Sequence, residues 1–259
     1  MPLMRRLTTA VLLVCLATTA LGTAHAAPTT PDSSGQRDAR DAPASDPIAA
    51  ARLASIAPGA NPKVLALALQ AADCARRQGQ SAVTKLAVID YSLPSTRPRL
   101  WVFDLDRVAL LFEELVAHGK GTGERLATRF SNVEGSKMSS LGLFRTGATY
   151  VGANGYSLRL EGLEPGFNDR AQPRAIVMHG APYVSRAIAQ NFGRLGRSWG
   201  CPAVRQEVAR PVIDALKGGS LLFAYYPDPR WLHESQYLSC AAARPLTAAQ
   251  PVARSRAGS

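Results

Sequence analysis

The hydrophobic period of the chain changes at Gly79, and this change limits the possible folds more than any other feature. Before Gly79, Asn61 and Pro62 form a helix start signal, and apolar residues recur at helical spacing to about Gln78. After Gly79, Gly and Pro separate apolar or alternating runs of strand length, at 85–92, 99–106, 108–117, 141–146, 157–160, 174–179 and 220–226. Dense turns between short strands predict a β-rich α+β domain with a few flanking helices.

The same patterns predict further helices and the limits of the domain. Helices are expected at 47–56, at about 183–190 and at 206–217, and the run at 108–117 fits a helix as well as a strand. Residues 27–46 contain almost no large apolar residues and are expected to form a flexible leader. We expect one domain over 47–240, with helices at 47–79 and a core at about 85–226, followed by a disordered tail at 241–259.

The first 26 residues have the features of a secretory signal peptide. Arg5 and Arg6 precede an apolar run over 10–21, and Ala24-His25-Ala26 is a small-residue cleavage site. No other segment approaches the roughly 18 apolar residues that a membrane span needs. The sequence therefore predicts export to the periplasm or cell envelope without stable membrane insertion.

The formal net charge of +11 predicts attraction to polyanions. The Lys and Arg residues are scattered, and no basic stretch is interleaved with aromatic residues, so nucleic acid is not an expected partner. An acidic polymer of the cell envelope fits better. The charge is equally consistent with a role in solubility alone.

Three of the four cysteines lie outside the signal segment. An odd number in an oxidising compartment predicts one disulfide and one free thiol. We expect Cys74 to pair with Cys240, because this bond would tie an N-terminal helix to the C-terminal end of the domain. Cys201 would then be free.

Cys201 and His179 supply the two groups that nucleophilic acyl transfer requires. A thiol needs a base within hydrogen-bond reach, and His179 ends an apolar strand while Cys201 lies on a glycine-bearing turn. The N–H groups of Gly200 and Cys201 are candidates to stabilise an oxyanion. A helix directly after Cys201 would lower the pKa of the thiol.

Other residues around this pair have expected supporting roles. Ser198 is expected to hydrogen-bond the loop or the substrate, and Trp199 to wall the cleft. The imidazole also needs an orienting group, for which Asp169, Glu207 and a backbone carbonyl near Gly180 are candidates.

Three other interpretations of the pair remain open. Cys201 and His179 can both be buried structural residues. Zinc binding is disfavoured because no C-x-x-C or H-x-x-x-H spacing occurs and His118 and His233 are isolated, so no metal and no cofactor are expected. A papain-like protease is disfavoured because there the cysteine precedes the histidine.

The chain resembles the murein L,D-transpeptidases of the YkuD type. The signature residues are His179-Gly180, a short spacer and Ser198-Trp199-Gly200-Cys201, followed by Pro202-Ala203. Similarity extends over about 85–226 and includes the blocks at 136–142, 166–169 and 174–181. The resemblance implies a β-sandwich of the YkuD type with a few flanking helices.

By the same resemblance, Cys201 would be the nucleophile, His179 the base and the carbonyl of Gly180 the group that orients the imidazole. The chain departs from the wider family at Trp199, where His is common, and at Ala203, where Arg is common. Carboxylate recognition would therefore use other residues. The candidates for substrate binding are Arg174, Arg197, Lys137, Ser139, Asn168, Ser198 and Trp199.

The implied substrates are peptidoglycan stem peptides. Cys201 would attack the amide carbonyl before a terminal D-Ala, release D-Ala and form a thioester, which an amine acceptor would then resolve. With water as acceptor the enzyme would be an L,D-carboxypeptidase or endopeptidase. A module of another class, which binds the wall without catalysis, is the third hypothesis.

Overall fold

A computed structural model describes residues 47–82 and 84–240. The expected signal peptide (1–26), leader (27–46) and tail (241–259) lie outside the described residues. The helices are α1 (Pro47–Ile56), α2 (Pro62–Arg77), α3 (Arg186–Phe192), α4 (Gln206–Leu216) and α5 (Pro229–Glu234). The strands are β1 (Lys85–Asp90), β2 (Leu100–Asp104), β3 (Ala109–Glu114), β4 (Val116–Ala117), β5 (Gly142–Gly152), β6 (Gly155–Gly162), β7 (Val177–Ala181), β8 (Ala203–Arg205) and β9 (Leu221–Tyr225).

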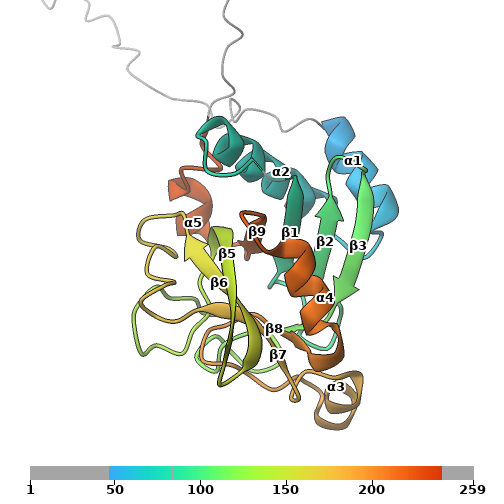
Figure 1. The fold of residues 1–259 in the computed structure, drawn as a ribbon, viewed down its shortest axis with the longest axis vertical. Helices are drawn as coiled ribbons and strands as arrows, with labels where there is room; N and C mark the ends of the chain where they lie inside the picture. Colours follow the sequence, from blue (N-terminus) through green and yellow to red (C-terminus); the bar gives the residue numbers. More distant parts are fainter. Residues whose placement is uncertain (1–46, 83, 241–259) are drawn as a thin grey trace, which may run out of the picture. The chain divides into compact units, whose positions relative to one another are not determined.

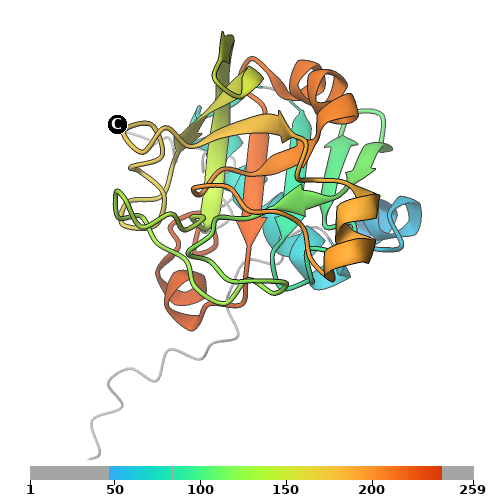
Figure 2. The same ribbon diagram turned by 90° about the horizontal axis from the view of Figure 1, so that it is seen from below.

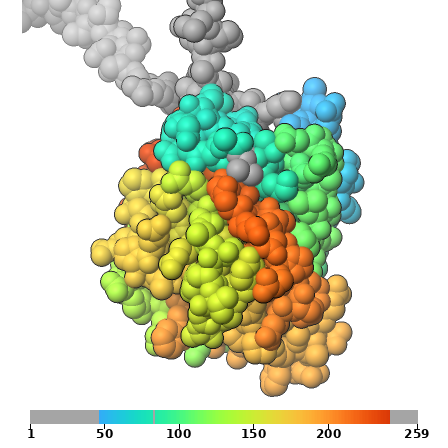
Figure 3. Space-filling view, in the orientation of Figure 1, coloured from blue at the N-terminus to red at the C-terminus, as the bar shows by residue number. Residues whose placement is uncertain are grey.

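The strands form one continuous mixed sheet in the order β3-β2-β1-β9-β5-β6-β7-β8-β4. The β1–β9 and β7–β8 pairs are parallel, and the other pairs are antiparallel. Figure 1 shows the helices around this sheet, and α4 crosses the face drawn in Figure 3 beside the β5–β6 hairpin. The expected β-rich α+β class with flanking helices is confirmed, and the strands of the expected sandwich are linked into a single sheet.

Helix α2 begins where the sequence predicted. The side chain of Asn61 accepts a hydrogen bond of 3.0 Å from the N–H of Lys63, and Pro62 occupies the first turn. The apolar face of α2 is buried against β1 and β9. Near the end of the helix, Cys74 forms a disulfide with Cys240, which is the expected pair, and Cys201 is a free thiol.

Two elements had no clear sequence signal. Strand β8 is only three residues long, too short to show a period, and it occupies the segment between Cys201 and α4. Helix α5 follows the expected end of the strands, and Asp228 caps it by accepting a hydrogen bond of 2.8 Å from the N–H of Trp231.

The run at 108–117 forms two strands, β3 and β4, and no helix. Across the described ranges, every helix is too short or too polar to cross a bilayer.

Packing of α4 against β7 fixes the position of the His179 strand. Gly180 faces Ala209 of α4, and a Cβ atom at Gly180 would lie 2.8 Å from the Cβ of Ala209. The absence of a side chain at Gly180 therefore lets the helix approach the strand closely. Figure 2 views the same ribbon from below, where the loop over 118–140 and the segment that leads to β8 run side by side, joined by a bridge between Gly119 and Ser198.

Candidate active site

His179 and Cys201 line one cavity of about 610 Å³. The parallel β7–β8 pair places them there, because His179 is opposite Ala203 in the register and Cys201 lies two residues before Ala203. The other lining residues come from the segments around 120, 154, 174–183 and 197–199. The structure therefore brings together the two residues that the sequence singled out.

The backbone of β7 and of the residues before it contacts the sulfur of Cys201. The N–H of Val177 lies 3.5 Å from Sγ, and the thiol donates to the carbonyl of Ala175 at 3.6 Å. Ala175 has a φ of 52°, a conformation that non-glycine residues rarely adopt. This unusual backbone turns the Ala175 carbonyl toward the thiol.

The imidazole of His179 is held in one tautomer. Its Nδ1 lies 2.9 Å from the carbonyl oxygen of Gly180, which can only accept, so Nδ1 carries the proton and Nε2 is left with its lone pair. Burial lowers the pKa of His179 below its ordinary value, against the effect of the Gly180 carbonyl. The ring is therefore neutral at neutral pH and able to accept a proton. Among the contacts of the described residues, none joins Nε2 directly to the Cys201 sulfur.

Burial raises the pKa of the Cys201 thiol above its ordinary value. The N–H of Val177 and the positive charge of Arg174 act in the opposite direction but do not outweigh burial. The expectation that a helix directly after Cys201 would lower this pKa is wrong, because β8 intervenes and α4 begins only at Gln206. At neutral pH the resting pair is a thiol beside a neutral imidazole.

Two hydroxyl groups brace the turn that carries Cys201. Ser139 donates to the carbonyl of Gly200 at 3.0 Å, and Ser198 donates to the carbonyl of Cys201 at 2.7 Å. The turn also requires glycine, because Gly200 has a φ of 128° and a Cβ there would lie 2.7 Å from the carbonyl oxygen of Met138. The turn is therefore fixed on both sides of the peptide that precedes Cys201.

The bracing changes the expected set of oxyanion donors. The N–H of Gly200 donates to the hydroxyl of Ser198 at 3.0 Å, so the prediction that it faces an oxyanion is wrong for this conformation. The N–H of Cys201 belongs to a trans peptide whose carbonyl points to Ser139, so this N–H points the opposite way. Only the Cys201 member of the predicted N–H pair stays available.

Asn168 and Ser139 are structural residues in this conformation, although we predicted both as substrate contacts. Asn168 is fully buried, and its amide donates to the carbonyls of Leu141 and Leu143 at 2.9 and 3.0 Å. Ser139 is 1% exposed, and its hydroxyl already donates to the Gly200 carbonyl of the turn. Neither residue is among those that line the cavity, and both use their polar groups to hold the loops of the protein.

Two of the three predicted basic residues, Arg174 and Arg197, line the cavity, and both are already bonded to other groups of the protein. Arg174 donates to the carbonyls of Ser131 and Met138 and to the hydroxyls of Ser140 and Ser136, at 2.6 to 3.3 Å. Arg197 bonds the carbonyl of Gly123 and pairs with Glu124.

Trp199 and Lys137 form the outer rim of the site. Trp199 lines the cavity and is 70% exposed, as expected for a wall. The ammonium nitrogen of Lys137 lies 5.2 Å from the centre of the Trp199 ring, a distance suited to a cation–π contact. Lys137 is therefore an outer contact of Trp199 and is not among the lining residues.

Sequence reasoning missed Lys120 and Tyr183, which both line the cavity. Burial raises the pKa of Tyr183 to about 12, so its hydroxyl is protonated at neutral pH. Neither residue belongs to a recognisable motif. Their positions follow from the folding of two loops onto the Cys201 turn, which spacing along the chain does not reveal.

A buried polar pair, Arg99 and His118, lies under the same loops. His118 is 1% exposed; its Nδ1 accepts a hydrogen bond of 2.8 Å from Arg99, and its Nε2 donates to the carbonyl of Gly123 at 3.2 Å. Burial and the charge of Arg99 lower the pKa of His118 to about 4. The backbone carbonyl of His118 accepts from the N–H of Ser198 at 3.0 Å, so this pair supports the Cys201 loop from below.

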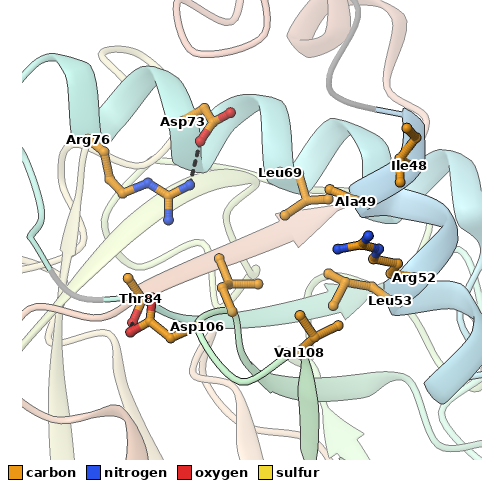
Figure 4. Close-up of a pocket in the computed structure, with 11 residues that line it drawn as sticks. Ile48, Ala49, Arg52, Leu53, Leu69, Asp73, Arg76, Thr84, Asp106 and Val108 are labelled. Carbon is orange, nitrogen blue, oxygen red and sulfur yellow. Dashed lines mark hydrogen bonds and ion pairs between the residues drawn. The ribbon is translucent and has the colours of Figure 1, made fainter.

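A second cavity, of about 550 Å³, lies between α1, α2 and the turn from β2 to β3 (Figure 4). Figure 4 shows Arg52, Leu69 and Asp106 around it, and Asp73 paired with Arg76. Its lining residues include no cysteine and no histidine. The two cavities are similar in size, and the chemistry of the side chains assigns the candidate active site to the first one.

Comparisons with known proteins identify one family. The model of the L,D-transpeptidase catalytic domain matches residues 56–225. A comparison with curated proteins gave no match.

Among solved structures, the chain is similar to LD transpeptidase LdtMt1 in complex with imipenem, with 15% identity, a TM-score of 0.34, and 55% of this chain and 59% of that chain covered. It is similar to the L,D-transpeptidase from Mycobacterium smegmatis, with 14% identity, a TM-score of 0.34 and coverage of 55% and 59%. It is also similar to the L,D-transpeptidase (Yku) from Stackebrandtia nassauensis, with 12% identity, a TM-score of 0.32 and coverage of 71% and 91%. The chain thus spans 59% of the length of each of the first two structures.

The rate at which iodoacetamide alkylates Cys201 is expected to rise through neutral pH, because only the thiolate reacts. The rate should keep rising above pH 9.0, the ordinary pKa of the thiol, because burial raises the pKa of Cys201. Mass spectrometry of Cys201 after fixed exposure times measures the rate, with the denatured protein as control. A plateau already reached below neutrality in the folded protein would mean that a thiolate is preformed, contrary to this account.

Stability is expected to depend on His118 between pH 6.5 and about 4. The unfolded chain binds a proton on this residue in that window and the folded chain does not, so stability is fully present above pH 6.5 and falls as the pH approaches 4. The loss assigned to His118 is about 3 kcal/mol. Denaturant unfolding at several pH values measures it, comparing wild type with His118→Gln and with His233→Gln, an exposed control.

NMR titration of the His118 ring in the folded protein gives an independent reading, with an expected midpoint of about 4. The account of the buried pair is wrong if the ring titrates near 6.5, or if wild type and His118→Gln lose stability equally on acidification.

Proposed function

The chain belongs to the L,D-transpeptidase catalytic domain family, and from this membership we propose that it is an exported enzyme that transfers peptidoglycan stem peptides through a Cys201 thioester. One observation carries the proposal most directly. A free thiol and a neutral imidazole, whose Nδ1 is bonded to the Gly180 carbonyl, line the same cavity. These are a nucleophile, a base and an orienting group.

In the first step the donor is a stem peptide that ends in D-Ala. The Cys201 side chain turns from the Ala175 carbonyl toward His179, and Nε2 accepts the thiol proton as sulfur attacks the carbonyl before D-Ala. The Sγ–C bond forms, and the N–H of Cys201 donates to the oxyanion. The C–N bond then breaks, Nε2 returns the proton to the leaving nitrogen, and D-Ala departs as an amine.

In the second step an amine acceptor attacks the thioester carbonyl. The acceptor is the side-chain amine of a diaminopimelate in a neighbouring stem, or a Lys side chain of an anchored protein. Nε2 takes a proton from the attacking nitrogen as the new C–N bond forms. The C–S bond breaks, and the proton passes to sulfur, which restores the starting thiol and imidazole.

The electrostatics of the pair support this route and not a resting ion pair. Burial favours the neutral forms of both Cys201 and His179. The proton therefore moves during the attack, when the developing charge on sulfur is spread onto the substrate carbonyl. General-base catalysis of this kind contributes about 10²–10⁴-fold to a rate. No metal or cofactor takes part in the proposed route.

Purified mature protein is expected to convert tetrapeptide muropeptides into cross-linked dimers with release of D-Ala, as read by mass spectrometry. Cys201→Ala should form no product, and His179→Ala should be slower by about 10²-fold or more. His233→Ala, at an exposed position of α5, is the matched control and should retain full activity.

The identity of the products also tests the alternatives. Shortened stems without dimers would select the hydrolase, in which water resolves the same thioester. Equal product patterns from wild type and Cys201→Ala would remove the enzymatic proposal and favour a non-catalytic module that binds the wall.

A further inference from the structure

The cavity that holds His179 and Cys201 is positively charged. Three basic residues line it, Lys120, Arg174 and Arg197, and none of its lining residues is Asp or Glu. Cavities lined by charges of one sign concentrate ligands of the opposite sign. The ligand that fits this cavity therefore carries at least one negative charge.

Most N–H donors of Arg174, and some of those of Arg197, already bond other groups of the protein. Arg174 makes four hydrogen bonds to the loop over 131–140, which leaves its guanidinium one N–H donor. Arg197 is bonded to Gly123 and Glu124. Arg174 therefore offers a ligand its charge but at most one direct hydrogen bond, whereas the charge of Arg197 is already paired with Glu124.

Lys120 differs from both arginines because its side chain is exposed and its ammonium group has no recorded partner within residues 47–82 and 84–240. Its backbone, by contrast, is fixed. The N–H of Lys120 donates to the carbonyl of Ser198 at 2.8 Å, and Gly119 pairs with Ser198 in a short bridge. The ammonium group of Lys120 is thus free, while hydrogen bonds hold the backbone of Lys120 against the segment that carries Cys201.

We propose that Lys120 binds the C-terminal carboxylate of the acyl-donor peptide and thereby selects donors that end in a free acid. This inference rests on the proposed function. The C-terminal carboxylate is the negative group of the donor closest to the scissile amide, because only the Cα of D-Ala separates the carboxylate from the amide nitrogen. When the scissile carbonyl lies at Cys201, this carboxylate falls inside the same cavity. Lys120 is thus a specificity-determining residue, which the family motifs do not include.

Binding to a protein that cannot react tests the inference without requiring turnover. Two donor tetrapeptides are compared, one with a free C-terminal acid and one with a C-terminal amide, against Cys201→Ala by calorimetric titration. The acid is expected to bind about tenfold more tightly than the amide, because the ammonium group of Lys120 attracts the charged carboxylate and not the uncharged amide.

The second variant adds Lys120→Ala to Cys201→Ala. Here the preference for the acid is expected to fall to about one, while the affinity for the amide stays unchanged. Lys120→Arg should keep most of the preference. Lys63→Ala, at an exposed position of α2, removes the same charge away from the cavity and should leave the preference intact.

The outcomes separate this inference from the function on which it rests. If Lys120→Ala weakens the acid and the amide equally, or neither, Lys120 does not bind the carboxylate. If the acid preference depends on Lys120 but wild type converts no muropeptide, the carboxylate site stands and the acyl-transfer proposal fails. In an enzyme that keeps Cys201, the Lys120→Ala substitution should raise KM for the acid about tenfold and leave kcat nearly unchanged.

Discussion

The peptide between Gly200 and Cys201 is the element on which the site depends. Its carbonyl is held by Ser139, the next carbonyl is held by Ser198, and close packing leaves no room for a side chain at Gly200. These contacts set the direction of the Cys201 N–H and the place where the thiol enters the cavity. A nucleophile held in this way loses little conformational freedom when a substrate binds.

Burial supplies the second constraint, because it decides the protonation states. The same enclosure that positions His179 and Cys201 keeps both neutral, so the base is ready to accept and the thiol is not spontaneously reactive. A buried, protonated thiol is less open to adventitious oxidation than an exposed thiolate. Arg174 and Lys120, which line the same cavity and have no ion-pair partner among the described residues, add positive charge that suits an anionic ligand.

Sequence patterns identified the features that depend on local chemistry. Asn61 and Pro62 located α2, the odd number of cysteines indicated one disulfide, and the joint presence of His179 and Cys201 indicated the cavity. Features that depend on three-dimensional packing were missed. Strand β8 was too short to detect, the Gly200 amide was assigned without knowledge of its Ser198 acceptor, and Lys120 reaches the site only because its loop pairs with Ser198.

The most direct test of the account is the mass of the intact protein after incubation with a tetrapeptide donor whose side-chain amine is acetylated, so that no amine acceptor is present. We expect an adduct on Cys201 equal to the donor minus D-Ala, released by hydroxylamine, and formed more slowly by His179→Ala. An unmodified protein that nevertheless releases D-Ala, or an adduct that persists in Cys201→Ala, would contradict the claim that this sulfur carries the acyl group.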